Sequence, residues 1–132
     1  MRFILMMTGP APRPGQGIDS WSKEDIQAHM AFMHELNGEL KAEGVLAAAE
    51  GLDYPPAPKI VRATRERKPS ITDGPFVETK EFLFGYWIVK VDTPEQAYEI
   101  AARASAAPGP GGEPLNMPIE VRQVMDGPPP IH

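Results

Sequence analysis

Few side chains in this sequence have the types and spacing needed for chemistry. The ionisable candidates are Asp73, His29, His34, Arg62, Arg122 and a charged cluster of Glu78, Lys80 and Glu81. A carboxylate and an imidazole within hydrogen-bond reach can act as general acid and base, and Asp73 and His29 are therefore the catalytic candidates. A guanidinium group binds a carboxylate or phosphate through two parallel hydrogen bonds, which makes Arg62 and Arg122 the candidates for ligand binding.

Asp73 opens an Asp-Gly-Pro tripeptide, which is typical of a tight turn. An Asp side chain accepts hydrogen bonds from backbone amides just ahead of it, glycine accepts a positive φ, and proline keeps the preceding residue out of the helical region. We expect a rigid turn with a positive φ at Gly74. Two interpretations of Asp73 stay open, a residue that only caps this turn and a functional acid whose pKa its charged neighbours tune.

The two histidines of the first expected helix fall on different faces. At about 100° per residue, His29 lies inside the apolar arc and His34 lies outside it. His29 is then either a satisfied core residue or a group that faces a pocket between helix and sheet. Because the two rings are five residues apart, they do not share a helical face for joint metal binding, and no metal site is expected.

Arg62 and Arg122 each alternate with apolar neighbours in a strand pattern. Each arginine either belongs to a solvated or salt-bridged edge or is a donor for an anionic ligand. The sequence alone leaves both alternatives open.

The order of expected elements predicts an α+β fold. Strands are expected at 3–7, 45–51, 59–64, 70–73, 82–91 and 117–125, and helices at 23–43 and from 94 through 104. The first helix has Ser22 as its N-cap, Gly44 as its C-terminal cap and a buried stripe of Ile26, Met30, Met33, Leu36 and Leu40. The segment 59–73 should form a hairpin around a charged tip at 65–68. This order matches a ferredoxin-like (split βαβ) antiparallel sheet with two helices on one face.

The strand at 82–91 is apolar in both of its alternating sets, so it should be covered on both faces. Two helices cover only one face of a sheet. A homodimer joined sheet to sheet, a dimeric α+β barrel-type assembly, is the simplest way to cover the other face. Residues 1–126 are expected to form one domain, and residues 127–132 a flexible C-terminal tail.

Composition excludes several classes of function. The net charge is −5 with dispersed basic residues, so no nucleic-acid partner is expected. No apolar run approaches the roughly 20 residues that span a bilayer, which predicts a cytoplasmic protein without a membrane partner. There is no cysteine, no phosphate-binding glycine loop and no nucleophile motif, and no cofactor is expected.

The run from Asp73 to Glu81, Asp-Gly-Pro-Phe-Val-Glu-Thr-Lys-Glu, resembles the signature of the DGPF branch of the YCII-related family. The blocks at 61–64, 70–73, 84–88 and 119–122 are similar to family blocks in the same order, so the resemblance covers roughly residues 1–125. It implies the ferredoxin-like plan and a dimer.

The wider family is suspected to use a histidine on the first helix and an aspartate as an acid/base pair. A count back from Gly44 puts that histidine position nearer Met33 or His34 than His29, and the second helix has no aspartate. Asp73 is the substitute that the DGPF resemblance suggests.

Two functions follow from the residues and the resemblance together. The first is a small-molecule-binding protein or cofactor-independent acid/base enzyme with a pocket near Asp73. YCII-related proteins have been linked to ring-cleavage-type and dehydrochlorinase chemistry. The alternative is a non-enzymatic regulatory or interaction module associated with sigma-factor-type transcription regulation.

Overall fold

The computed structural model describes residues 1–10, 15, 17–54, 57–74 and 81–130. Its helices and strands are β1 Arg2–Pro10, α1 Lys23–Ala42, β2 Leu46–Gly51, β3 Lys59–Arg62, β4 Ser70–Asp73, β5 Glu81–Lys90, α2 Pro94–Ser105 and β6 Ile119–Val124. Short 3-10 turns precede α1 and β6. Every expected helix and strand is present, with β1 longer and β3 shorter than the pattern predicted.

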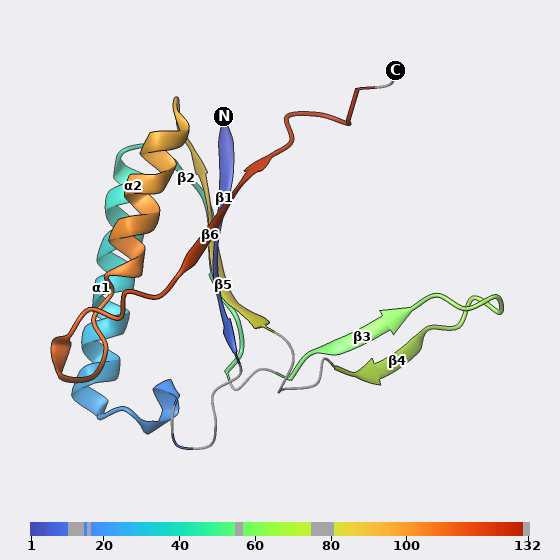
Figure 1. The fold of residues 1–132 in the computed structure, drawn as a ribbon, viewed down its shortest axis with the longest axis horizontal. Helices are drawn as coiled ribbons and strands as arrows, with labels where there is room; N and C mark the ends of the chain where they lie inside the picture. Colours follow the sequence, from blue (N-terminus) through green and yellow to red (C-terminus); the bar gives the residue numbers. More distant parts are fainter. Residues whose placement is uncertain (11–14, 16, 55–56, 75–80, 131–132) are drawn as a thin grey trace.

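Four strands form the main sheet in the order β2-β5-β1-β6, and all neighbouring strands are antiparallel. With the β3–β4 hairpin set aside, this is the ferredoxin-like order, and the predicted fold class is confirmed. Figure 1 shows α1 and α2 side by side on one face of the sheet. The opposite face of the sheet is not covered by any described helix or strand.

Helix α1 begins and ends as its sequence predicts. The Ser22 side chain accepts a hydrogen bond from the Asp25 amide at 3.1 Å. At the other end, Gly44 has a φ of 75°, its amide donates to the Lys41 carbonyl, and the Val45 amide donates to the Leu40 carbonyl. These two bonds form a Schellman motif, which needs a left-handed residue at the glycine position.

The buried stripe of α1 differs from the predicted stripe at one position. Leu36 and Leu40 are buried and Met33 is half-buried, but Met30 is 57% exposed. His29, the neighbour of Met30, is buried instead. The turn that carries both residues faces a cavity rather than packed core, so the apolar side chain there keeps contact with solvent.

Helix α2 starts with a full capping box. Thr93 accepts a hydrogen bond from the Gln96 amide, and the Gln96 side chain accepts one from the Thr93 amide. The alanines and isoleucine of α2 that face the sheet are buried. The core formed between the helices and the sheet includes Leu5, Leu40 and Val89, all fully buried.

Strand β5 is apolar on two faces, as expected, but its alternation changes at one point. The register against β1 shifts between Met7 and Thr8, and Phe84 is the extra residue of a β-bulge. Beyond the bulge, Phe82 is buried and Leu83 is exposed, whereas strict alternation along the strand would put Leu83 on the same face as the buried Trp87. A bulge shifts every side chain beyond it to the other face, which sequence alternation alone does not reveal.

The predicted hairpin is a separate two-stranded sheet of β3 and β4, and all eight strand residues are exposed. The expected positive φ at Gly74 is wrong, because that glycine does not lie in the left-handed region. A Cβ at Gly74 would approach Ile60 Cγ1 at 2.8 Å. Glycine therefore serves close packing there, and its amide donates to the Pro58 carbonyl at 3.4 Å.

None of the helices in the described ranges is both long and apolar enough to cross a membrane.

We predict opposite effects for two glycine substitutions in and next to α1. Gly44→Ala should lower the free energy of unfolding by about 1 kcal/mol, because alanine is strained at positive φ. Gly38→Ala should raise it by about 0.5–1 kcal/mol, because Gly38 is an exposed residue inside the helix with open space around its Cα. Urea unfolding of both variants measures this, and a Gly44→Ala variant as stable as wild type or more stable would contradict the assigned C-terminal cap.

Candidate functional site

A cavity of about 540 Å³ lies between α1 and the sheet. Residues from α1, β1, β2 and β5 line it, together with the segments that precede α1 and β6. Its apolar side chains include Met7, Met30, Met33, Leu115 and Met117. Methionine is unbranched and flexible, so such a wall adapts to ligands of different shape. The bulge residue Phe84 also contributes to this wall.

His29 is the only buried polar or charged side chain among the described residues, and it lines this cavity. Its Nδ1 lies 3.0 Å from the carbonyl oxygen of Pro108, in the segment that follows α2. A carbonyl oxygen can only accept, so Nδ1 carries the hydrogen and donates it. In the neutral ring, Nε2 therefore keeps a lone pair and can accept a proton.

Trp21 fixes the orientation of the His29 ring from a second direction. The two rings meet edge to face, with their centroids 5.5 Å apart and their planes at 82°. The segment after α2 is tied to α1 once more, where the Gly111 amide donates to Asp25 Oδ2 at 3.2 Å. These contacts restrict the imidazole to one position, as a proton-transfer group requires.

Asn37 is a cavity residue that the sequence analysis missed. Its Oδ1 accepts a hydrogen bond of 2.7 Å from Trp87 Nε1. Because the indole nitrogen can only donate, this bond fixes the side-chain amide and leaves its NH₂ group as a donor. Asn37 lies two helical turns after His29, about 12 Å along the axis. The signal in the sequence was an asparagine, a poor helix former, inside a helix and four residues after an apolar position.

Tyr54 brings a phenol hydroxyl to the cavity. Its ring lies beside that of Phe84, at a centroid distance of 6.3 Å. Burial raises the pKa of the Tyr54 phenol, and the nearby Asp19 carboxylate raises it further, whereas a backbone hydrogen bond at Ile18 acts in the opposite direction. The phenol therefore stays protonated at neutral pH and can donate or accept a hydrogen bond.

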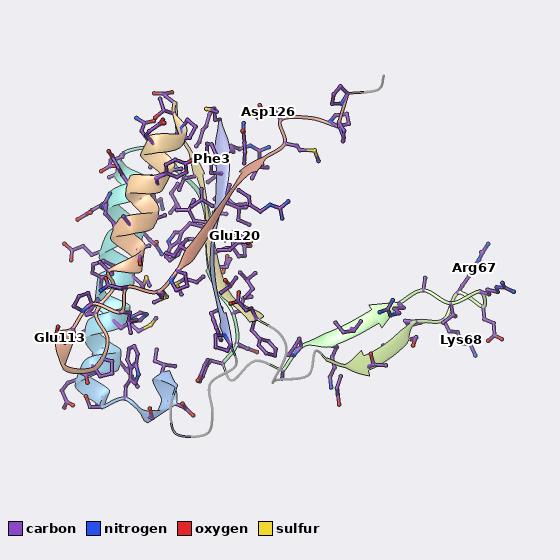
Figure 2. All side chains as sticks on the ribbon, in the orientation of Figure 1. Phe3, Arg67, Lys68, Glu113, Glu120 and Asp126 are labelled. Atoms are coloured by element: carbon purple, nitrogen blue, oxygen red, sulfur yellow. The ribbon has the colours of Figure 1, made fainter. Side chains whose placement is uncertain are left out.

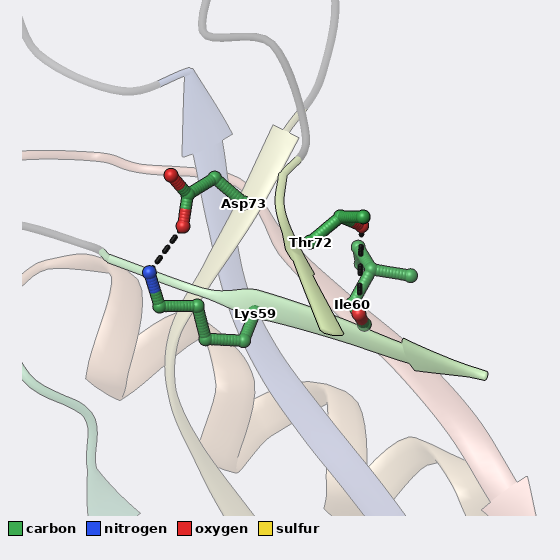
Figure 3. A network of polar contacts seen from close by, with 4 residues as sticks. All are labelled: Lys59, Ile60, Thr72 and Asp73. Atoms are coloured by element: carbon green, nitrogen blue, oxygen red, sulfur yellow. Dashed lines mark hydrogen bonds and ion pairs between the residues drawn. The ribbon is translucent and has the colours of Figure 1, made fainter. Parts of the chain in front are cut away.

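Asp73 lies on the hairpin, away from the residues that line the His29 cavity. Figure 3 shows its carboxylate paired with the Lys59 ammonium across the two strands. The Asp73 side chain is 86% exposed. The hydrogen bond from Lys59, reinforced by the positive charge of that lysine, holds the pKa of Asp73 below its ordinary value. The carboxyl group is therefore ionised at neutral pH and is not a proton donor there.

The other predicted site residues are dispersed. Arg62 is exposed on β3, and Arg122 is exposed on β6, opposite Ile4 on the uncovered face of the sheet. Neither arginine lines the His29 cavity. His34 is exposed, as expected, and of the charged cluster after the turn only Glu81 lies within the described residues.

A second, smaller cavity of about 360 Å³ lies between α1 and α2. The ion pair of Arg103 with Glu39 lies at its wall, and it contains no histidine. Across the described ranges, no three His, Cys, Asp or Glu side chains come together as metal ligands do. The His29 cavity is therefore the candidate site.

Comparison with known families identifies the chain. The YCII-related domain family matches residues 1–111, which include β1 through α2 and the His29 cavity except for its last wall residues. The chain belongs to this family. No curated protein matches the sequence.

We predict that Lys59→Met raises the pKa of Asp73 towards its ordinary value, because both the hydrogen bond and the positive charge are lost. An NMR titration of the Asp73 carboxyl carbon measures the pKa. The Lys59 pair favours the folded state above the unfolded pKa of the carboxyl, and this contribution disappears as the pH falls through the lower folded value. Lys41→Met on α1 is the control and should leave the Asp73 titration unchanged. An Asp73 pKa that does not respond to Lys59→Met would show that the two side chains are not paired in solution.

Proposed function

We propose that this protein binds an apolar small molecule in the His29 cavity and exchanges a proton with it through His29 Nε2, without a cofactor. The hydrogen bond between His29 Nδ1 and the Pro108 carbonyl carries this proposal, because it leaves Nε2 as the ring atom that can accept. The ligand chemistry that fits is a ring or chain of mostly apolar surface with one hydroxyl or similarly acidic group. A general base of this kind accelerates a reaction by about 10²–10⁴-fold.

The Asn37 amide supports a second contact at the other end of the cavity. Its NH₂ group is free of the Trp87 bond and suits a carbonyl or ether oxygen of the ligand. The partnership of His29 with Asp73 stays a proposal of its own. Asp73 lies on the hairpin and does not line the cavity of its own chain, so a site that His29 and Asp73 share would require the hairpin of a second copy.

The second part of the proposal is a homodimer joined through the uncovered face of the main sheet. Ile4, Met6, Tyr86 and Ile88 are half-buried on this face, and Ala48 lies opposite Ile88. A solvated face of an antiparallel sheet usually carries polar side chains, whereas an apolar patch of this kind marks an association surface. A second copy of the same face is the simplest complement.

We predict that the hydroxyl of a probe is recognised by His29. In wild-type protein, 2-naphthol should bind about 3- to 10-fold more tightly than 2-methoxynaphthalene, which corresponds to the net free-energy contribution of one hydrogen bond. Quenching of tryptophan fluorescence measures both affinities, since Trp21 and Trp87 line the cavity.

His29→Phe keeps an aromatic ring against Trp21 but removes the nitrogen, and it should abolish this preference. His34→Phe on the exposed face should retain it. Circular dichroism confirms that both variants fold. A preference that survives in folded His29→Phe, or no binding of either naphthalene to wild type, would refute the proposal.

We predict a solution mass of about twice the 14.5 kDa of one chain by light scattering at micromolar concentration. Ile88→Lys should produce monomers, because it places a charge at the centre of the uncovered face. Ala28→Lys, on the exposed side of α1, should leave the dimer intact. A monomeric wild type, or a dimer that both variants retain, would contradict sheet-to-sheet association.

A further inference from the structure

The β3–β4 hairpin is a projecting arm, defined here as residues 59–73. Figure 1 shows it extending away from the main sheet on the side opposite the helices. The arm thus borders the space that faces the uncovered sheet. It is composed of two strands of four residues each, and an isolated hairpin of this size is at best marginally stable in water.

The arm carries an unpartnered apolar pair. Val61 and Ile71 lie directly opposite each other on the two strands, and each is 60% exposed. Burial of these two adjacent β-branched side chains against another surface would lower the free energy of the system. The exposed pair therefore favours contact between the arm and another protein surface.

The charge of the arm is opposite to that of the rest of the chain. Residues 59–73 contain five basic and two acidic side chains, whereas the whole chain has a net charge of −5, so the remainder carries −8. Figure 2 shows Arg67 and Lys68 at the far tip of the arm. Both helices carry more acidic than basic side chains, among them Glu24, Glu35, Glu95 and Glu99. The tip is therefore complementary to the helix layer of another copy.

The length of the arm suits this contact. From Lys59 to Glu66 the chain can extend by roughly 23 Å at about 3.3 Å per residue, and packed sheets lie about 10 Å apart. An arm of this length passes the sheet of a facing copy and reaches the layer of its helices. Nucleic acid is a poorer occupant, because the acidic body repels phosphates and because an apolar pair is part of the arm.

We propose that residues 59–73 form an arm that packs against a second copy of this chain. The apolar pair covers the edge of the second sheet, and the basic tip contacts the acidic helices. By symmetry, the arm of each copy contacts the other copy. This inference rests on the sheet-to-sheet dimer proposed above, to which it adds a second and electrostatic contact surface.

The test compares the dimer dissociation constants of two charge-reversal variants by sedimentation at low salt. Arg65→Glu/Lys68→Glu at the tip should weaken the dimer about tenfold or more, because four attractive contacts per dimer become repulsive. Lys23→Glu/Lys41→Glu on α1 makes the same change in net charge, but it adds negative charge to the helix surface that the tip contacts, so it should leave the dimer as tight as wild type or tighter. The difference between the variants should shrink as salt is raised.

A second measurement locates the tip directly. The chain has no cysteine, so Glu66→Cys provides one unique attachment point for a maleimide photo-crosslinker. Irradiation should give a product of dimer mass on a denaturing gel, and the same label in the Arg65→Glu/Lys68→Glu background should give far less of it. Peptide mapping should place the crosslink on the helices or sheet edge of the other chain.

The outcomes separate the arm from the dimer. A dimer with equal dissociation constants in both reversal variants, and with tip crosslinks only within one chain, would overturn the arm and leave the dimer standing. A wild-type monomer would overturn both. Binding of wild-type protein to double-stranded DNA that the tip reversal abolishes, with an unchanged dimer, would also overturn the proposal and assign the arm to nucleic acid.

Discussion

A four-stranded sheet with apolar side chains on both faces is the constraint on which the rest of this structure depends. The two helices cover one face, where Leu5 and Val89 are fully buried. The same alternation sends Ile4 and Ile88 to the other face, where nothing in the described part of the chain covers them. The sheet therefore separates the His29 cavity, under the helices, from the apolar face that we propose for association.

The cavity on the helix side follows from the unequal packing of α1. Its C-terminal half presents Leu36 and Leu40, which fill the space over the sheet. Its N-terminal half presents His29 and Met30 to the cavity, and no α-helix of the described residues packs over that end. The segment after α2 crosses there instead and contributes the Pro108 carbonyl. An incompletely filled core with one oriented imidazole is a suitable place for a small molecule, since tight packing and an open site exclude each other.

The run that carries the family resemblance begins on the arm and not in the cavity. Asp73 is exposed, ionised and paired with Lys59. These are the properties of a surface carboxylate at the end of a strand and not those of a buried acid. Figure 3 also shows Thr72 beside Ile60, so the polar contacts of this region link the two strands to each other. These contacts join the two strands of the arm, and none of the described residues 59–73 lines the cavity, which is why we assign the two regions separate roles.

Local sequence determined the helices, the strands and the fold class, because caps and periodicity act over a few residues. Ser22, Gly44 and Thr93 marked helix ends correctly, and the 3.6-residue pattern placed His29 inside and His34 outside. The DGPF resemblance also led to the correct family. Only the tertiary structure decided the contacts between distant segments. The Pro108 and Trp87 partners of α1 lie 79 and 50 residues away, and no local pattern encodes such pairings.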